Sequence, residues 1–234
     1  MGHVMDIGDR LYPETSNNLM VAITSTMLDE DSPYASSMSA LYEKVTSNTL
    51  GLSTNRSVVL NMLWQPYLAY EDNSTYKMLL NGFDGNLDDD SYFAKLNRAY
   101  REMTEEERAN GDRDQWLIRM SSKVVGKDLT DFYEAHGIVA NATTLEYVSQ
   151  FPKETKKIQY INDEARRRRM AGTADMEAGT TLSAEFGTDS KGNKITDGSY
   201  VNDKKVSINL SVDKSNDNIL GYEIYRNGNL VDLL

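Results

Sequence analysis

The first 170 or so residues show the spacing of apolar positions that is typical of amphipathic helices. Apolar residues recur every three or four positions and therefore fall on one face of a helix. The segment 58–70 is apolar on most sides, so we expect its helix to be buried. The pattern predicts helices at about 14–28, 33–45, 58–70, 92–103, 112–125, 130–136, 143–151 and 153–170.

Local signals mark where several of these helices begin and end. Thr104 followed by Glu107 has the spacing of a capping box, which predicts the start of a further short helix. Gly126 stands directly after the predicted helix 112–125, where a glycine can adopt the left-handed conformation that ends helices. The chain up to this region is therefore predicted to be mainly α.

The hydrophobic period changes to two near residue 171, where Gly, Thr, Ser, Asp and Asn also become more frequent. Asn227-Gly228 is a strong signal for a two-residue hairpin turn. The last stretch resembles part of a fibronectin-III or Ig-like module, but such a sandwich needs about seven strands and roughly 100 residues. We therefore expect a helical domain at 1–172 and a partial β-sandwich module at 173–234, with exposed strand edges. The predicted strands are 181–186, 205–212, 220–226 and 230–233.

Composition excludes several classes of protein. The chain of 234 residues carries a net charge of −11, which argues against a nucleic-acid-binding face. It has no cysteine, so disulfides, thiolate metal sites and cysteine nucleophiles are excluded. No apolar run reaches the roughly 18 residues of a membrane span, and no signal peptide is recognisable. A monomer without a membrane span is the expected state.

Candidate metal chemistry lies in the first eighteen residues. Gly2-His3 has the form of the last part of a His-Glu-x-x-His helix, and Glu14 follows after a segment that can turn back. Catalytic zinc commonly takes three protein ligands, such as two histidines and one glutamate, and keeps a fourth position for water. His3 and Glu14 are therefore candidate metal ligands.

The runs Gly2-His3-Val4-Met5-Asp6 and Glu14-Thr15-Ser16-Asn17-Asn18 resemble the active-site region of the enhancin-type zinc metallopeptidases. These gluzincins include peptidases that degrade mucins and other O-glycosylated proteins. The resemblance implies the helical C-terminal part of a zincin-like catalytic domain. It also implies zinc ligation by His3 and Glu14, and a substrate-binding or ligand-orienting role for Asn17 and Asn18.

The family's first histidine and general-base glutamate would stand before Met1. We therefore expect this chain alone to be inactive and to hold zinc weakly or not at all. The resemblance further implies a secreted or cell-surface protein, with any signal upstream of this chain, that hydrolyses peptide bonds in glycosylated substrates. Two alternatives stay open: a noncatalytic module that binds host glycoprotein or carbohydrate, and a helical protein in which the His3–Glu14 spacing is accidental.

His136 is the second of the two histidines in the chain. It stands in the last turn of the predicted helix 130–136, directly before Gly137, where it can complement the helix C-terminus. We expect this structural role. The alternative is a substrate-binding or transition-state role across a cleft, for which the sequence gives no position.

Overall fold

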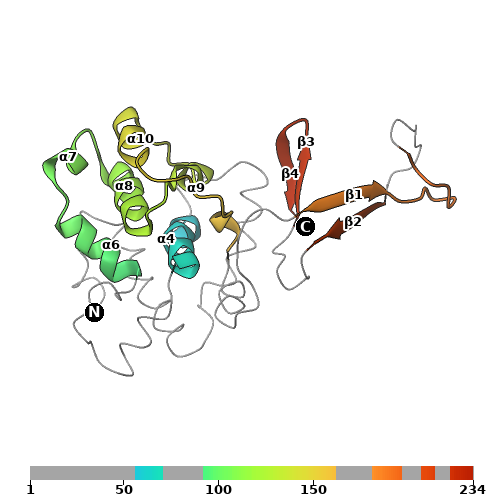
Figure 1. The fold of residues 1–234 in the computed structure, drawn as a ribbon, viewed down its shortest axis with the longest axis horizontal. Coiled ribbons are helices and arrows are strands. Elements are labelled where there is room, and N and C mark those ends of the chain that lie inside the picture. The colour runs from blue at the N-terminus through green and yellow to red at the C-terminus, as the bar shows by residue number, and fades with distance from the viewer. Residues whose placement is uncertain (1–55, 71–91, 162–180, 197–206, 214–221, 234) are drawn as a thin grey trace, which may run out of the picture.

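The computed structural model describes residues 56–70, 92–161, 181–196, 207–213 and 222–233, with side chains in the first of these ranges described from Leu63 onward. The helices gather at one end of the molecule and two β-ribbons lie at the other (Figure 1). The helical elements are α4 (Arg56–Tyr70), α6 (Tyr92–Arg101), α7 (Glu105–Arg108), α8 (Arg113–Val125), α9 (Thr130–Ala135), α10 (Ala142–Val148) and the 3-10 turn η3 (Ile158–Tyr160).

The hydrophobic core lies between α4, α6 and α8, with α9 and η3 against it. Residues 63–69 of α4 are all buried, which confirms the expectation for this apolar segment. The Trp64 and Tyr67 rings stack at 4.5 Å, and Tyr67 stacks on Phe93 of α6 at 5.4 Å. Such aromatic pairs bury large apolar areas, and they fix α4 against α6.

The helix ends follow the local signals in the sequence. Thr104 and Glu107 form the predicted capping box at the start of α7. Asp112 caps α8 through its carboxylate, which accepts from the amides of Asp114 and Gln115. Gly126 ends α8 in the left-handed conformation, with φ 70°. These predicted boundaries are confirmed.

The predicted helix 153–170 is wrong for the residues that the structure describes, 153–161. Here the chain is extended beside the start of α9 and forms only the short turn η3. The Asp128 amide donates to the Pro152 carbonyl at 2.9 Å, and the Glu154 amide donates to the Asp128 carbonyl at 3.1 Å. Pairing with a distant segment therefore replaces the local helix that the composition favoured. Residues 162–170 lie outside the described ranges.

In the described part of the chain, the β elements form two separate antiparallel ribbons. β1 (Leu182–Phe186) pairs with β2 (Ile208–Val212), and β3 (Glu223–Arg226) pairs with β4 (Asn229–Leu233). The turn between β3 and β4 has φ 53° at Asn227 and φ 80° at Gly228, as a primed two-residue turn requires. The predicted strands and this hairpin are confirmed where they are described.

The β1–β2 ribbon has one apolar face and one polar face, because side chains alternate along each strand. Paired residues Phe186↔Ile208 and Ala184↔Leu210 share a face with Leu182↔Val212. Phe186 and Ile208 remain 41% and 56% exposed, so this apolar face is not packed into a sandwich core. The described strands therefore form two ribbons, and the expected β-sandwich is not confirmed.

The helical body and the second ribbon meet at η3. The Tyr160 hydroxyl donates to Glu223 Oε1 of β3 at 2.8 Å, and Lys157 Nζ lies 4.0 Å from the same oxygen. The Gln65 amide of α4 in turn donates to the carbonyls of Gln159 and Ile161. In the described part of the chain, no helix has the length and apolar character needed to cross a bilayer.

Candidate functional site

The predicted metal site falls outside the described residues. His3, Glu14, Asn17 and Asn18 all belong to the segment 1–55, so the structure neither brings them together nor separates them. Within the ranges that the structure describes, no three His, Asp or Glu side chains are grouped so that they could hold a metal ion. The ligand assignment stays a prediction from the sequence.

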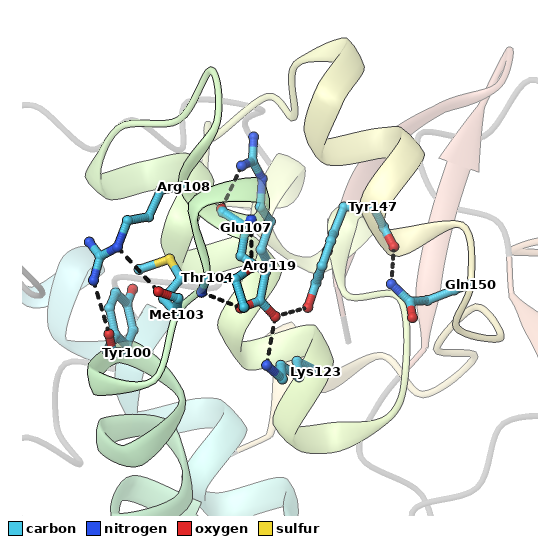
Figure 2. Close-up of polar contacts among 9 residues, drawn as sticks. All are labelled: Tyr100, Met103, Thr104, Glu107, Arg108, Arg119, Lys123, Tyr147 and Gln150. Atoms are coloured by element: carbon cyan, nitrogen blue, oxygen red, sulfur yellow. Dashed lines mark hydrogen bonds and ion pairs between the residues drawn. The ribbon is translucent and has the colours of Figure 1, made fainter.

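The main polar cluster of the helical body surrounds Glu107 of α7 (Figure 2). Its Oε1 accepts from Lys123 Nζ of α8 at 2.6 Å and from the Tyr147 hydroxyl of α10 at 2.8 Å. Its Oε2 accepts from the Thr104 amide at 2.8 Å. Both carboxylate oxygens are therefore occupied, and one buried side chain joins α7, α8 and α10.

The electrostatics of this cluster suit a structural ion pair. Burial alone would raise the pKa of Glu107, but the hydrogen bonds from Lys123, the Thr104 amide and Tyr147 outweigh it and lower the pKa to about 2. Burial and the bond to the Glu107 carboxylate raise the pKa of the Tyr147 hydroxyl. A carboxylate with so low a pKa is a poor general base near neutral pH, so catalysis is not expected here.

Arg119 of α8 lies beside this cluster and is only 1% exposed. Its Nη1 donates to the carbonyls of Glu107 at 2.7 Å and Ala109 at 2.8 Å, and its Nε donates to Thr144 Oγ1 at 2.9 Å. The two carbonyls stand at the C-terminal end of α7, where helical carbonyls lack partners. The guanidinium therefore caps α7 and binds the first turn of α10 (Ala142–Val148).

His136 is fully buried at the end of α9. Its Nδ1 lies 2.8 Å from the Phe132 carbonyl, and its ring packs on that of Phe132 at 4.5 Å. Burial lowers the pKa of the imidazole to about 4, and the hydrogen bond to Phe132 opposes this only in part. The expected structural role is confirmed by this geometry. However, the ring is neutral near pH 7, so its contribution is a hydrogen bond and packing, without the favourable charge at a helix end.

The contacts of Arg119, and those of Glu107 with Lys123 and Tyr147, could not be predicted from the sequence. Arg119 stands in an amphipathic helix where a charged residue is ordinarily solvated, and its partners are backbone carbonyls, which carry no sequence signal. The capping box did predict one contact of Glu107, with Thr104. Its bonds to Lys123 and Tyr147 join residues 16 and 40 positions away, which a local pattern cannot indicate.

Several solved structures with a similar fold are metallopeptidases or their catalytic domains from Clostridium perfringens. The catalytic module of the metalloprotease ZmpA from Clostridium perfringens matches with a TM-score of 0.59 and 21% identity. ZmpB metallopeptidase from the same organism matches with a TM-score of 0.57 and 24% identity. Each match covers 100% of this chain but only 40% and 42% of the solved chain. The chain thus has the fold of less than half of such a module.

A third match is the M60 catalytic domain of Clostridium perfringens ZmpC in complex with the sialyl T antigen. Its TM-score is 0.56 and its identity 25%, over 100% of this chain and 41% of that one. No curated protein matches the chain.

The similarity shows that the chain has the fold of part of such catalytic modules. The family model described as "Peptidase M60, enhancin and enhancin-like" matches residues 4–137, which is more than half of the chain. The chain belongs to the M60 family of enhancin and enhancin-like peptidases. The matched segment includes Glu14, Asn17 and Asn18 and begins one residue after His3.

Proposed function

We propose that this chain is part of a zinc metallopeptidase that hydrolyses peptide bonds in mucin-like or other glycosylated proteins outside the cell. Membership of the M60 family carries the proposal. The complex of the related ZmpC domain with the sialyl T antigen supports a glycosylated substrate. The alternating strands after residue 181 are proposed to belong to an Ig- or fibronectin-III-like module of the same protein.

In this proposal His3 and Glu14 hold the metal. An imidazole nitrogen and a carboxylate oxygen are both ordinary zinc donors, so the donor set fits the ion. When bound, zinc polarises the scissile carbonyl and lowers the pKa of its water. Asn17 and Asn18 are proposed to orient a ligand or to bind the substrate backbone, because hydrogen bonds to metal ligands fix their orientation.

The 234-residue chain by itself is proposed to be inactive. It contains no His-Glu-x-x-His sequence, so it offers two of the three protein ligands and no glutamate in the general-base position. The buried Glu107 of the helical body does not replace that base, because both of its carboxylate oxygens already accept hydrogen bonds.

The test is cleavage of an O-glycosylated mucin by a polypeptide that extends this chain upstream, so that His-Glu directly precedes Met1 and completes the His-Glu-x-x-His motif with His3. We expect new peptide termini in mass spectra, and none with the 234-residue chain alone. Glu14→Ala should lower kcat/KM by at least roughly a hundredfold, because a catalytic metal contributes several kcal/mol to the transition state.

Glu146→Ala is the matched control, since this glutamate is exposed on α10; it should leave kcat/KM unchanged. Cleavage that survives Glu14→Ala would refute the ligand assignment. Binding of the mucin without any cleavage would instead support a noncatalytic glycoprotein-binding module.

A further inference from the structure

The buried histidine of α9 is held in one orientation and one tautomer. A carbonyl oxygen can only accept, so Nδ1 carries the proton in the 2.8 Å bond to Phe132. The Nε2 atom is also buried and has no hydrogen-bond partner in the structure. The neutral ring is therefore buried with an Nε2 lone pair that accepts no hydrogen bond.

A second proton on this ring would be costly. It would sit on Nε2, where it would add a positive charge and a new N–H donor with no acceptor beside it. An unpaired buried donor is destabilising, and more so when the group is charged. The ring cannot turn Nε2 to solvent without giving up the Nδ1 bond, because His136 has 0% exposure.

The charged groups on α9 and beside it are either exposed or bound to partners other than His136. On α9, Asp131 and Glu134 are exposed. Before α9, Asp128 accepts from Thr130 and pairs with Lys153. η3 packs against α9. The titratable groups of η3 and its flank are Tyr160, which donates to Glu223, and Lys157, which lies near the same carboxylate.

We propose that protonation of His136 at Nε2 destabilises the C-terminal end of α9, so that this buried ring makes the packing of α9 sensitive to acid. The proposal does not depend on peptidase activity, because it concerns only this interior contact. Protonation would loosen the end of α9, close to residue 137, where the family match ends.

The direction of the pH effect follows from where the two states take up the proton. In the unfolded chain the imidazole of His136 takes up its second proton near pH 6.5. In the folded chain burial lowers the pKa of this imidazole to about 4. The unfolded state therefore binds more protons between these values, and stability falls as the pH falls from about 6.5 to about 4. The hydrogen bonds to Asp128 lower the pKa of that carboxyl below 3.8, so its effect comes at more acid pH.

The experiment is urea unfolding of the 234-residue chain between about pH 7 and pH 4.5, followed by tryptophan fluorescence. We expect the unfolding equilibrium constant to rise by on the order of 100-fold over this range, given the shift of His136. His136→Asn should remove most of that rise, because its amide can donate to the Phe132 carbonyl but does not titrate. His3→Asn is the matched control, since these are the two histidines of the chain, and it should retain the rise.

An equal acid response in wild type and His136→Asn, or its loss in His3→Asn, would overturn the proposal.

If His136→Asn does not fold, histidine C2-hydrogen exchange measured by mass spectrometry on the wild type decides instead. A titration of His136 well below that of His3 supports the proposal, and titration near pH 6.5 overturns it. Native-state amide exchange should also accelerate first in residues 130–138 and 158–161 as the pH is lowered.

Discussion

Among single residues, Arg119 and Glu107 each join neighbouring helices of the helical body through three side-chain hydrogen bonds. Arg119 satisfies two carbonyls at the end of α7 and the Thr144 hydroxyl of α10. Glu107 binds Lys123 and Tyr147 from the neighbouring helices (Figure 2). Because α7 has only four residues, these two side chains hold in place a helix too short to be stable by itself.

Arg119→Met is expected to destabilise the chain by roughly 2–5 kcal/mol, because it leaves the carbonyls of Glu107 and Ala109 and the Thr144 hydroxyl without their donor. Thermal or urea unfolding at neutral pH measures this loss. Arg101→Met is the matched control, since Arg101 is exposed at the end of α6, and it should change stability by no more than about 0.5 kcal/mol. Equal effects of the two substitutions would show that the buried bonds contribute little.

At this scale the sequence could predict His136 but not Arg119. The histidine stands next to Gly137 at a helix end, which is a local signal for a structural role. Its charge state could not be predicted, because the pKa depends on complete burial in the fold. The partners of Arg119 are carbonyls 10 and 12 positions away. Only the packing of α7 on α8 brings them together.

At the scale of elements, the helix and turn boundaries set by neighbouring residues could be predicted from the sequence. The extended segment 153–157 could not. The capping box at Thr104, the left-handed Gly126 and the Asn227-Gly228 turn each depend on neighbouring residues alone. The extended segment 153–157 depends instead on a β-bridge between Lys153 and Asp128. The Lys153 ammonium also donates hydrogen bonds to Thr130 and Asp131 at the start of α9. Tertiary contacts override a weak helix preference there.

Gly126→Ala is expected to lower stability by roughly 1–2 kcal/mol, because an alanine in the left-handed conformation is strained. The cost is conformational, since an added Cβ at this position would meet no atom within 4 Å. Gly126→Asn should cost less, because asparagine tolerates this conformation better. The midpoint of urea unfolding measures both variants. Equal losses would indicate that something other than backbone strain is responsible.

At the scale of the whole molecule, the helical body is well packed and the ribbons are not. The core residues of α4, α6 and α8 are nearly all buried, whereas every residue of β1 is exposed. Periodicity predicted both the helices and the strands that the structure describes. It could not predict how the two ribbons are arranged, because that depends on contacts at η3, such as Tyr160 with Glu223.

The zinc affinity of the chain tests the metallopeptidase assignment most directly. Placing His-Glu before Met1 produces His-Glu-Met1-Gly2-His3, which completes the motif with His3 at the i+4 position. Calorimetry on this extended chain should show one zinc per chain, bound much more tightly than by the 234-residue chain. Glu14→Ala in the extended chain should weaken binding by more than the roughly 10–100-fold that loss of a ligand's hydrogen-bonding neighbour costs. If neither the added His-Glu nor Glu14→Ala changes the zinc affinity, a metal site formed by His3 and Glu14 is contradicted.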